Sequence, residues 1–267
     1  MLDASITALT GLTDARAAWA ALFRPHERIA IKVNAFQCSR VWTHAPLVAA
    51  LTDCLQEAGV PPEQIVIYDR LSTELKTAGF AVNWGDPGVR CQGNDNLYAP
   101  GWRIADVAVG LSKVLLRCDA LINVPILKAH GDAGISFALK NHYGTVDPLP
   151  LLHGDKFDPA ISELNALPEI RERTRLVIGD ALGICIQVEE TLPFWREAKP
   201  GDSILVGYDP VAVDCQALKL FSKVLSAHGG DPAWAQGRAS AWLKRAAGLG
   251  VGTDDEANMR LVELALD

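Results

Sequence analysis

The sequence predicts an α/β fold with a mostly parallel sheet and helices on both faces. We expect a single compact domain interrupted by two loop excursions. Short apolar runs alternate with amphipathic helical patterns, which is typical of parallel strands joined by crossover helices. The 267 residues are 49% hydrophobic and 21% charged, which is sufficient for one large core. We find no internal repeat and no low-complexity linker that would divide the chain.

The first half of the chain contains two strand–helix units after a helical start. Apolar spacing from Ile6 to Phe23 predicts one helix, or two short ones broken at Gly11. The following elements are predicted by apolar runs, caps and turn residues: a strand at 29–33, a helix at 45–58 with Thr43 as N-cap, a strand at 65–68 and a helix at 72–78. Residues 83–103, rich in Gly, Asn, Asp and Pro, form the first loop excursion, with short strands near 89–92 and 102–104.

The second half continues the alternation and ends in helices. Its predicted elements are a helix at 112–117, a strand at 120–124 within a buried run to Leu127, a helix at 133–143, a loop excursion at 147–160, a helix at 161–173, strands at 176–179 and 203–207, and a helix at 210–225. Asp209 precedes Pro210 and is expected to cap that last helix. Two C-terminal helices are expected within 232–266, at 232–247 and 255–266.

Composition disfavours several classes of partner. The formal net charge is -7 and no tract is rich in Lys and Arg, which argues against nucleic acid or an anionic membrane. No apolar run reaches the roughly 18 residues of a membrane span. The N-terminus as written has no signal peptide, so a cytoplasmic protein is expected, although a longer exported precursor stays open. The six cysteines include no C-x-x-C pair, so an iron–sulfur cluster held by this chain alone is not expected. Cys38, just beyond a strand end, is the one cysteine that we single out for reactivity.

Polar residues gather where the predicted strands end. Parallel α/β sheets bind ligands beyond the carboxyl ends of their strands. These ends supply Lys32 and Asn34, Asp69 and Arg70, Lys128 and His130, Asp180 and Asp209. We therefore expect a binding site at this edge.

The stretch from residue 128 to 142 is the most informative part of the chain. In an extended segment Lys128 and His130 project to the same side. Asp132, Ser136 and Lys140 are spaced i, i+4 and i+8, so a continuous helix would place them on one face, with Asn141 beside them. Two ammonium groups and an imidazole beside a buried strand are costly without a partner, which favours a bound carboxylate or phosphate.

Two further residues leave alternatives open. His153, in the loop LLHGDKF, is either a solvated histidine or a ligand-binding group that reaches over the site. Asp214 lies in an apolar helical stretch and is either a buried partner for a lysine or a solvated position. A metal site built from His130, His153 and Asp180 is a third reading of the same residues, although no helical zinc spacing is present.

The residues resemble domain-of-unknown-function family 362. The matching segments are IKVN at 31–34 with THAPLVAAL at 43–51, the long INVPILKAHGDAGISFALKNHYGTV at 122–146, and GYDPVAVD at 207–214. The similarity spans about residues 28–225. Members are often joined to, or found beside, ferredoxin-like iron–sulfur modules, so the resemblance implies a separate ferredoxin-like protein as a partner for any redox role.

A more distant resemblance links the chain to the lactate-racemase superfamily of nickel-pincer enzymes. There a strand leads to a histidine and then to a G-x-S-G-G-x-K segment whose lysine anchors the cofactor. GISFALK, residues 134–140, would place Lys140 at that lysine, with Phe137 and Ala138 in place of the paired glycines. The resemblance implies the fold and the location of the site. The cofactor is left open.

The sequence thus supports three hypotheses on function. In the first, Lys128 and Lys140 hold a small anionic molecule such as a hydroxy or keto acid while His130 transfers a proton. Lys32, Asn34, Ser136, Asn141, His153, Asp180 and Asp214 are its candidate ligand-binding residues. In the second, the protein is a non-catalytic ligand-binding module or an accessory of an iron–sulfur redox system. In the third, it binds a metal.

Overall fold

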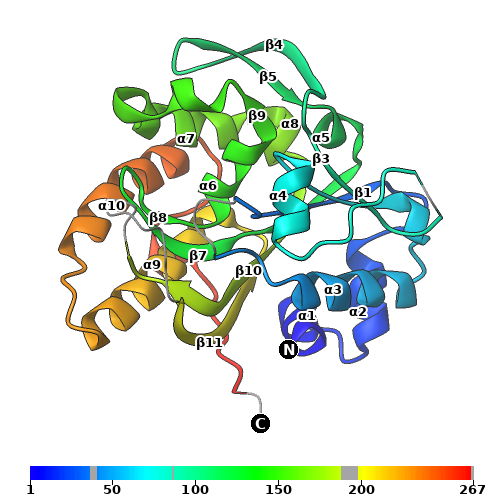
Figure 1. Cartoon of the computed structure of the whole chain (residues 1–267). Coiled ribbons are helices and arrows are strands. Elements are labelled where there is room, and N and C mark those ends of the chain that lie inside the picture. Colours follow the sequence, from blue (N-terminus) through cyan, green and yellow to red (C-terminus); the bar gives the residue numbers. More distant parts are fainter. Residues whose placement is uncertain (37–40, 86, 188–197, 266–267) are drawn as a thin grey trace.

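The structure is a computed structural model that describes residues 1–36, 41–85, 87–187 and 198–265. Its main element is an eight-stranded sheet (Figure 1). Five of its strands pair side by side in parallel, in the order β3 (Arg90–Gly93), β2 (Ile65–Asp69), β1 (Ile29–Val33), β6 (Ala120–Val124) and β10 (Thr174–Cys185). The α/β class and the mostly parallel sheet are therefore confirmed.

The long strand β10 joins this parallel core to three further strands. It pairs with β6 through Thr174–Val177, and beyond Pro125 it pairs in parallel with β7 (Ile126–His130). β8 (Gly134–Ser136) is antiparallel to β7, and β11 (Ala198–Gly207) is antiparallel to β10. The sequence pattern predicts an end of this strand at Gly179, but β10 runs on to Cys185, so Asp180 lies inside a strand and not at its end.

Alternate residues of the strands pack into two separate apolar cores. Ile29 and Ile31 of β1 contact one core, whereas Ala30 contacts the other. The first core is covered by α1 (Leu2–Thr10), α2 (Ala15–Leu22) and α3 (Ala45–Glu57), and the second by α7 (Phe157–Ala166), α9 (Pro210–Ala227) and α10 (Ala233–Gly248) (Figure 1). This period of two is what a sheet buried on both faces requires.

Shorter elements complete the chain. A three-stranded antiparallel sheet consists of β4 (Tyr98–Ile104), β5 (Val107–Ser112) and β9 (Val146–Asp147). The short helices are α4 (Ser72–Thr77), α5 (Lys113–Arg117), α6 (Ala138–Asn141) and α8 (Pro168–Arg171), with 3-10 turns η2 (Pro62–Gln64), η3 (His142–Thr145), η4 (Leu149–Leu152), η5 (Gly154–Lys156) and η6 (Glu256–Asn258). None of the helices in the described ranges combines the length and apolarity of a membrane span.

Several element predictions are confirmed and four are wrong. The chain does break at Gly11, and Asp209 does cap α9 through Val211 N and Ala212 N. Thr43 is not the cap of α3: that position belongs to His44, and the Thr43 hydroxyl bridges Asn34 N and Val124 O instead. The other three errors are the early end predicted for β10 and the helices predicted at 133–143 and 255–266.

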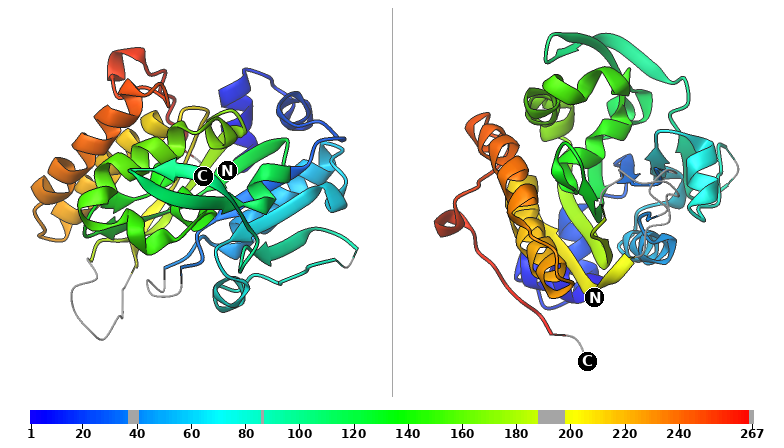
Figure 2. Two further views of the ribbon diagram at one scale, coloured as in Figure 1. Left: turned by 90° about the horizontal axis from the view of Figure 1, so that it is seen from above. Right: turned by 60° about the vertical axis from the view of Figure 1, so that its left-hand side comes forward.

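The second C-terminal helix is replaced by extended chain. After α10 the described residues form only η6, and Figure 2 shows an extended segment with one short turn there. Its apolar side chains Leu261, Val262 and Leu264 stay exposed, so this segment has no core to fold against. Residues 266 and 267 and the flagged Cys38 lie outside the described ranges.

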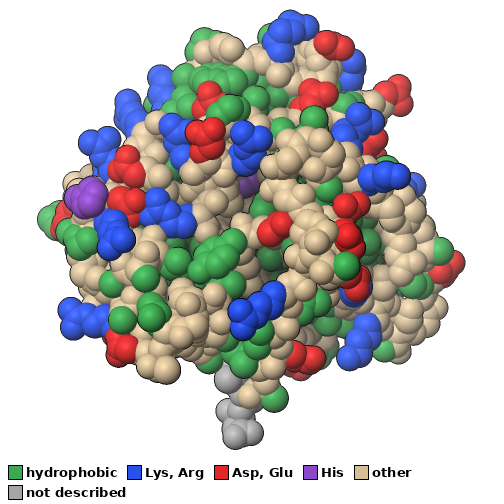
Figure 3. Space-filling model, turned by 180° about the vertical axis from the view of Figure 1, so that it is seen from behind, with side chains coloured by type: hydrophobic (Ala, Val, Ile, Leu, Met, Phe, Trp, Pro, Cys, Tyr) green, Lys and Arg blue, Asp and Glu red, His purple; other side chains and the backbone are tan. Residues whose placement is uncertain are grey.

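The surface carries charges of both signs. On the face seen from behind in Figure 3, lysine and arginine side chains are interspersed with aspartate and glutamate.

Candidate functional site

The site lies where the strand order reverses. β1 has β2 on one side and β6 on the other, and the chain runs outward in both directions from this pair. Ligands bind in sheets of this kind beyond the carboxyl ends of the strands at such a switch point. Lys32 lies near that end of β1, and Asn34 follows it. Asn123 pairs with Lys32 from β6.

A fully buried ion pair anchors the site. The Lys32 ammonium is 2.7 Å from Asp69 Oδ1, and both side chains are almost completely shielded from solvent. Burial lowers the pKa of Lys32, while the Asp69 carboxylate opposes that shift. Asp69 Oδ2 also accepts Ala35 N at 2.6 Å. Lys32 therefore already has a carboxylate partner, and this ion pair has a structural role in the site.

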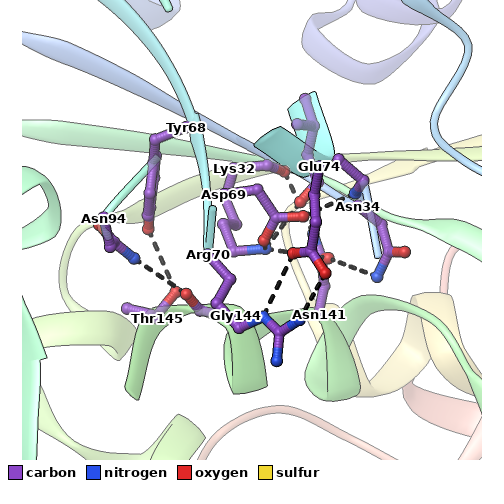
Figure 4. Close-up of polar contacts among 12 residues, drawn as sticks. Lys32, Asn34, Tyr68, Asp69, Arg70, Glu74, Asn94, Asn141, Gly144 and Thr145 are labelled. Atoms are coloured by element: carbon purple, nitrogen blue, oxygen red, sulfur yellow. Dashed lines mark hydrogen bonds and ion pairs between the residues drawn. The ribbon is translucent and has the colours of Figure 1, made fainter. Parts of the chain in front are cut away.

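Asn141 joins three segments of the chain into one network. Its Oδ1 accepts from Lys32 Nζ and from Asn34 Nδ2, each at 3.3 Å. Its Nδ2 donates to Lys32 O at 3.1 Å and to Asn123 Oδ1 at 2.7 Å. Lys128 Nζ then donates to Asn34 Oδ1 at 2.8 Å. Four residues that we expected at this edge, Lys32, Asn34, Lys128 and Asn141, are thus brought together (Figure 4 shows the Lys32, Asn34 and Asn141 part).

The backbone of η3 packs directly on the ion pair. A Cβ atom at Gly144 would lie 2.3 Å from Asp69 Oδ1 and 2.8 Å from Lys32 Nζ. Asn94 Nδ2 donates to Gly144 O at 2.9 Å, and Tyr68 and Thr145 share a hydroxyl contact of 3.3 Å (Figure 4). η3 is therefore held at a distance from Lys32 that only glycine permits.

Lys140 lies in a different environment from Lys32. It is 7% exposed, and its Nζ is 3.3 Å from His153 Nε2 and 3.3 Å from the centre of the Tyr143 ring. Burial lowers its pKa well below the usual value, with repulsion from Lys128 and Lys32 in the same direction. The nearby Asp132 carboxylate opposes this shift. In the described part of the chain Lys140 forms no ion pair.

The two site histidines stack on each other beside Lys140. The rings of His130 and His153 have centroids 6.0 Å apart, and Phe157 packs against both. Asp132 N and Ala133 N donate to His130 Nδ1, so the neutral ring carries its proton on Nε2. His153 Nδ1 donates to Leu149 O at 3.2 Å, which leaves Nε2 as the acceptor facing Lys140. Burial and the Lys140 charge lower the pKa of His153.

Asp132, Ser136 and Lys140 do not share a helix face. Residues 126–136 form the β7–β8 hairpin, in which Ser136 pairs directly opposite Lys128. Gly134 has φ +81°, and a Cβ there would lie 2.3 Å from Ala235 O. Because of this left-handed residue between Asp132 and Ser136, the segment cannot form the continuous helix that the i, i+4 spacing predicted. Ser136 still lies next to Lys128, through strand pairing instead of helical stacking.

Asp214 is buried but bonds to the backbone instead of to a lysine. Its two carboxylate oxygens accept Ala138 N at 2.7 Å and Leu139 N at 3.0 Å. It thereby fixes the start of α6, the helix that carries Lys140. Burial raises the pKa of Asp214 to about 7, against the lowering effect of the two N–H groups.

We expect Asp214 to make stability depend on pH near neutrality. A carboxyl whose pKa is raised by folding stabilises the folded state below its unfolded pKa, and this contribution is lost as pH rises through about 7. The corresponding free energy is at most about 4 kcal/mol. Denaturant unfolding from pH 4 to 8 should show this loss in the wild type and in exposed Asp53→Asn, but not in Asp214→Asn. Parallel pH profiles for all three proteins would contradict the assignment.

The sequence pattern placed Asp180 in the site but missed its histidine partner, His44. Asp180 is fully buried, and its Oδ2 accepts His44 Nδ1 at 2.7 Å and His44 N at 2.8 Å. The other edge of the His44 ring is exposed. His44 follows Thr43, whose hydroxyl binds Asn34 N, so this pair borders the lysine network. No sequence pattern indicates that Asp180 and His44 pair, because 136 positions separate them.

Other members of the site were also missed. The sequence pattern marks Asp69 only as a strand-end residue, and Asn123 could have been found as the single polar side chain in the run from 120 to 127. Tyr143, three residues after Lys140, supplies the ring beneath its ammonium group. Phe137 is buried with its ring against Gly179, within the second core.

The residues suggested for a metal are not brought together as a set. Asp180 is bonded to His44, whereas His130 and His153 stack beside Lys140. Among the residues that the structure describes, no three His, Cys, Asp or Glu side chains lie close enough to share one metal ion.

Comparison with known proteins places the chain in a family. Two similar solved structures are a crystal structure of a Thermotoga maritima protein (16% identity, TM-score 0.47) and the lactate racemase apoprotein of Thermoanaerobacterium thermosaccharolyticum (9% identity, TM-score 0.45). They cover 80% and 84% of this chain, which spans 58% and 54% of their own lengths. No curated protein matches the chain. Residues 29–219 match the family described as domain of unknown function DUF362. The chain therefore belongs to the DUF362 family.

Proposed function

We propose that the protein binds a small carboxylic acid anion beside Lys140 and Lys128 and transfers a proton to or from it. The substrate class would be a hydroxy or keto acid. Lys140 is the residue that binds the carboxylate in this proposal, with Lys128 as a second cation across the site. His130 and His153 handle the proton.

The observation that supports this proposal is that Lys140 is buried and forms no ion pair within the described residues. A buried ammonium group is costly unless an anion or several acceptors compensate for the lost water. The His153 imidazole lies 3.3 Å from the Lys140 ammonium group, and the centre of the Tyr143 ring is also 3.3 Å from it. Lys32, by contrast, has its own carboxylate at 2.7 Å. Lys140 therefore has the capacity to receive a carboxylate that Lys32 lacks.

The two histidines present complementary hydrogen-bonding groups. His130 would offer a proton from Nε2, because its Nδ1 accepts two backbone N–H groups. His153 has its lone pair on Nε2 toward Lys140, and its lowered pKa favours the neutral base. One donor and one acceptor beside the same lysine suit a proton transfer at an acidic C–H or O–H bond.

Binding should be linked to proton uptake. A bound carboxylate stabilises the ammonium form of Lys140 and thus raises its pKa, so an anion binds more tightly as pH falls. We would titrate the protein with lactate, glycolate, pyruvate and glyoxylate by calorimetry in two buffers that differ in ionisation enthalpy. The proposal predicts saturable binding with uptake of a proton by the protein.

Two variants make this experiment decisive. Lys140→Met should lose at least about tenfold in affinity, as expected when a charged hydrogen bond to the ligand is removed. Lys223→Met, on the exposed side of α9, removes the same charge elsewhere and should bind as the wild type does. Equal affinity in the two variants, or no binding by any of the four acids, would contradict the proposal. Binding without hydrogen exchange in D2O, at C2 of lactate or glycolate or at the methyl group of pyruvate, would instead support a non-catalytic role, including service to a separate ferredoxin-like protein.

A further inference from the structure

A small polar pocket borders η3, which directly follows helix α6. It has a volume of about 60 Å³, which is room for a few water molecules or one small oxyanion. The pocket is lined by eight residues from η3, α7, α8, β10, the start of α9 with the residue Tyr208 before it, and the C-terminal segment. These residues are His142, Asn165, Ile170, Arg171, Thr174, Tyr208, Pro210 and Val251. None of the residues named in our candidate site belongs to this lining.

His142 gives this pocket a polar atom that needs a partner. The side chain is 1% exposed, and its Nδ1 makes no hydrogen bond. A buried polar atom without a partner destabilises the folded state, and a ligand that binds it removes that cost. Burial, with repulsion from Lys32, lowers the pKa of His142 to about 3, so the ring is neutral near pH 7 and has an N–H to donate.

The remaining polar lining favours a negatively charged occupant. Arg171, whose side chain is exposed, and Tyr208 also line the pocket, and they carry a guanidinium group and a hydroxyl donor. Among the described lining residues there is no aspartate or glutamate. Guanidinium groups bind planar and tetrahedral oxyanions through paired hydrogen bonds.

We propose that this pocket is a second ligand site, which binds a small oxyanion of the size of phosphate or acetate between His142 and Arg171. The proposal is independent of the function assigned to Lys140, because it uses different residues. The amide of Asn165 already donates to Leu139 O and Ile161 O, which fixes one wall of the pocket in place.

The test follows the His142 ring directly. Protein labelled with ¹³C-histidine would be titrated with sodium phosphate and sodium acetate at constant ionic strength, with chloride as the balancing anion. The His142 resonance is identified with His142→Gln. We expect a saturable shift of this resonance with at least one of the two anions, and a higher Tm at saturation because the ligand binds only the folded state.

Three variants distinguish binding in this pocket from binding elsewhere on the protein. Arg171→Gln should weaken binding at least about tenfold. Exposed Arg117→Gln makes the same charge change outside the pocket and should bind as the wild type does. Lys140→Met should also leave the shift unchanged, whether or not the first site binds carboxylates. A shift that fails to saturate, that persists in Arg171→Gln, or that disappears in Lys140→Met would overturn the proposal.

Discussion

Gly144→Ala should lower the free energy of unfolding by about 3–5 kcal/mol, the usual cost of disrupting a buried ion pair. The added methyl group would lie 2.3 Å from Asp69 Oδ1 and 2.8 Å from Lys32 Nζ, far inside van der Waals contact. η3 cannot retreat easily, because Asn94 holds the Gly144 carbonyl and Thr145 contacts the Tyr68 hydroxyl. Separation of Lys32 from Asp69 would leave each buried charge without its opposite charge, with only hydrogen bonds to neutral groups remaining.

Gly237→Ala is the matched control for this prediction. Gly237 lies inside α10, and a Cβ there meets no atom within 4 Å. Alanine should therefore leave stability unchanged or raise it by about 0.5–1 kcal/mol through its higher helix propensity. Denaturant unfolding of both variants measures the difference. If Gly144→Ala were as stable as Gly237→Ala, the close approach of η3 to the ion pair would be wrong.

The elements that the sequence predicted well are those with local signals. β1 and β6 are short apolar runs, and α9 begins at an Asp-Pro cap that needs no information from elsewhere. The rule that parallel strands direct their carboxyl ends to one edge was enough to gather Lys32, Asn34 and Lys128. These predictions depended on pattern and topology, not on exact contacts.

The errors come from contacts with distant parts of the chain. The hairpin at 126–136 resembles loop and helix in sequence because Asp132, Ser136 and Lys140 happen to follow helical spacing. What decides its geometry is the backbone of α10 at Ala235, about a hundred positions away, which requires the left-handed Gly134. The pairing of Asp180 with His44 likewise depends on which strand lies next to β6. No local pattern encodes either contact.

The partner of Asp214 also depends on a contact that no local sequence pattern reveals. Its position in an apolar stretch correctly suggested burial as one alternative, but the partner was expected to be a lysine. The partner is the N-terminus of α6, which exists only because the predicted longer helix is absent. A wrong local element thus led to a wrong electrostatic partner.

His130→Gln should reduce proton transfer by a factor of about 10²–10⁴ while leaving ligand affinity within a few-fold of the wild type. In our proposal His130 is the proton donor, whereas Lys140 binds the carboxylate. Glutamine can still accept a backbone N–H through its side-chain oxygen, as His130 Nδ1 accepts Asp132 N and Ala133 N, but it has no titratable proton. The measurement is the rate at which the acid found by calorimetry exchanges hydrogen with D2O, at C2 of a hydroxy acid or at the methyl group of pyruvate.

His228→Gln is the control for this loss, since that histidine lies at the exposed end of α9 and donates to Val224 O. It should exchange hydrogen at the wild-type rate. Lys140→Met should fail at the binding step, so it should raise the concentration of acid needed for half-maximal exchange, whereas His130→Gln should lower the maximal rate. Wild-type exchange in His130→Gln would contradict the role of His130 and assign the proton to another group, such as the imidazole of His153, whose ring centre is 6.0 Å from that of His130.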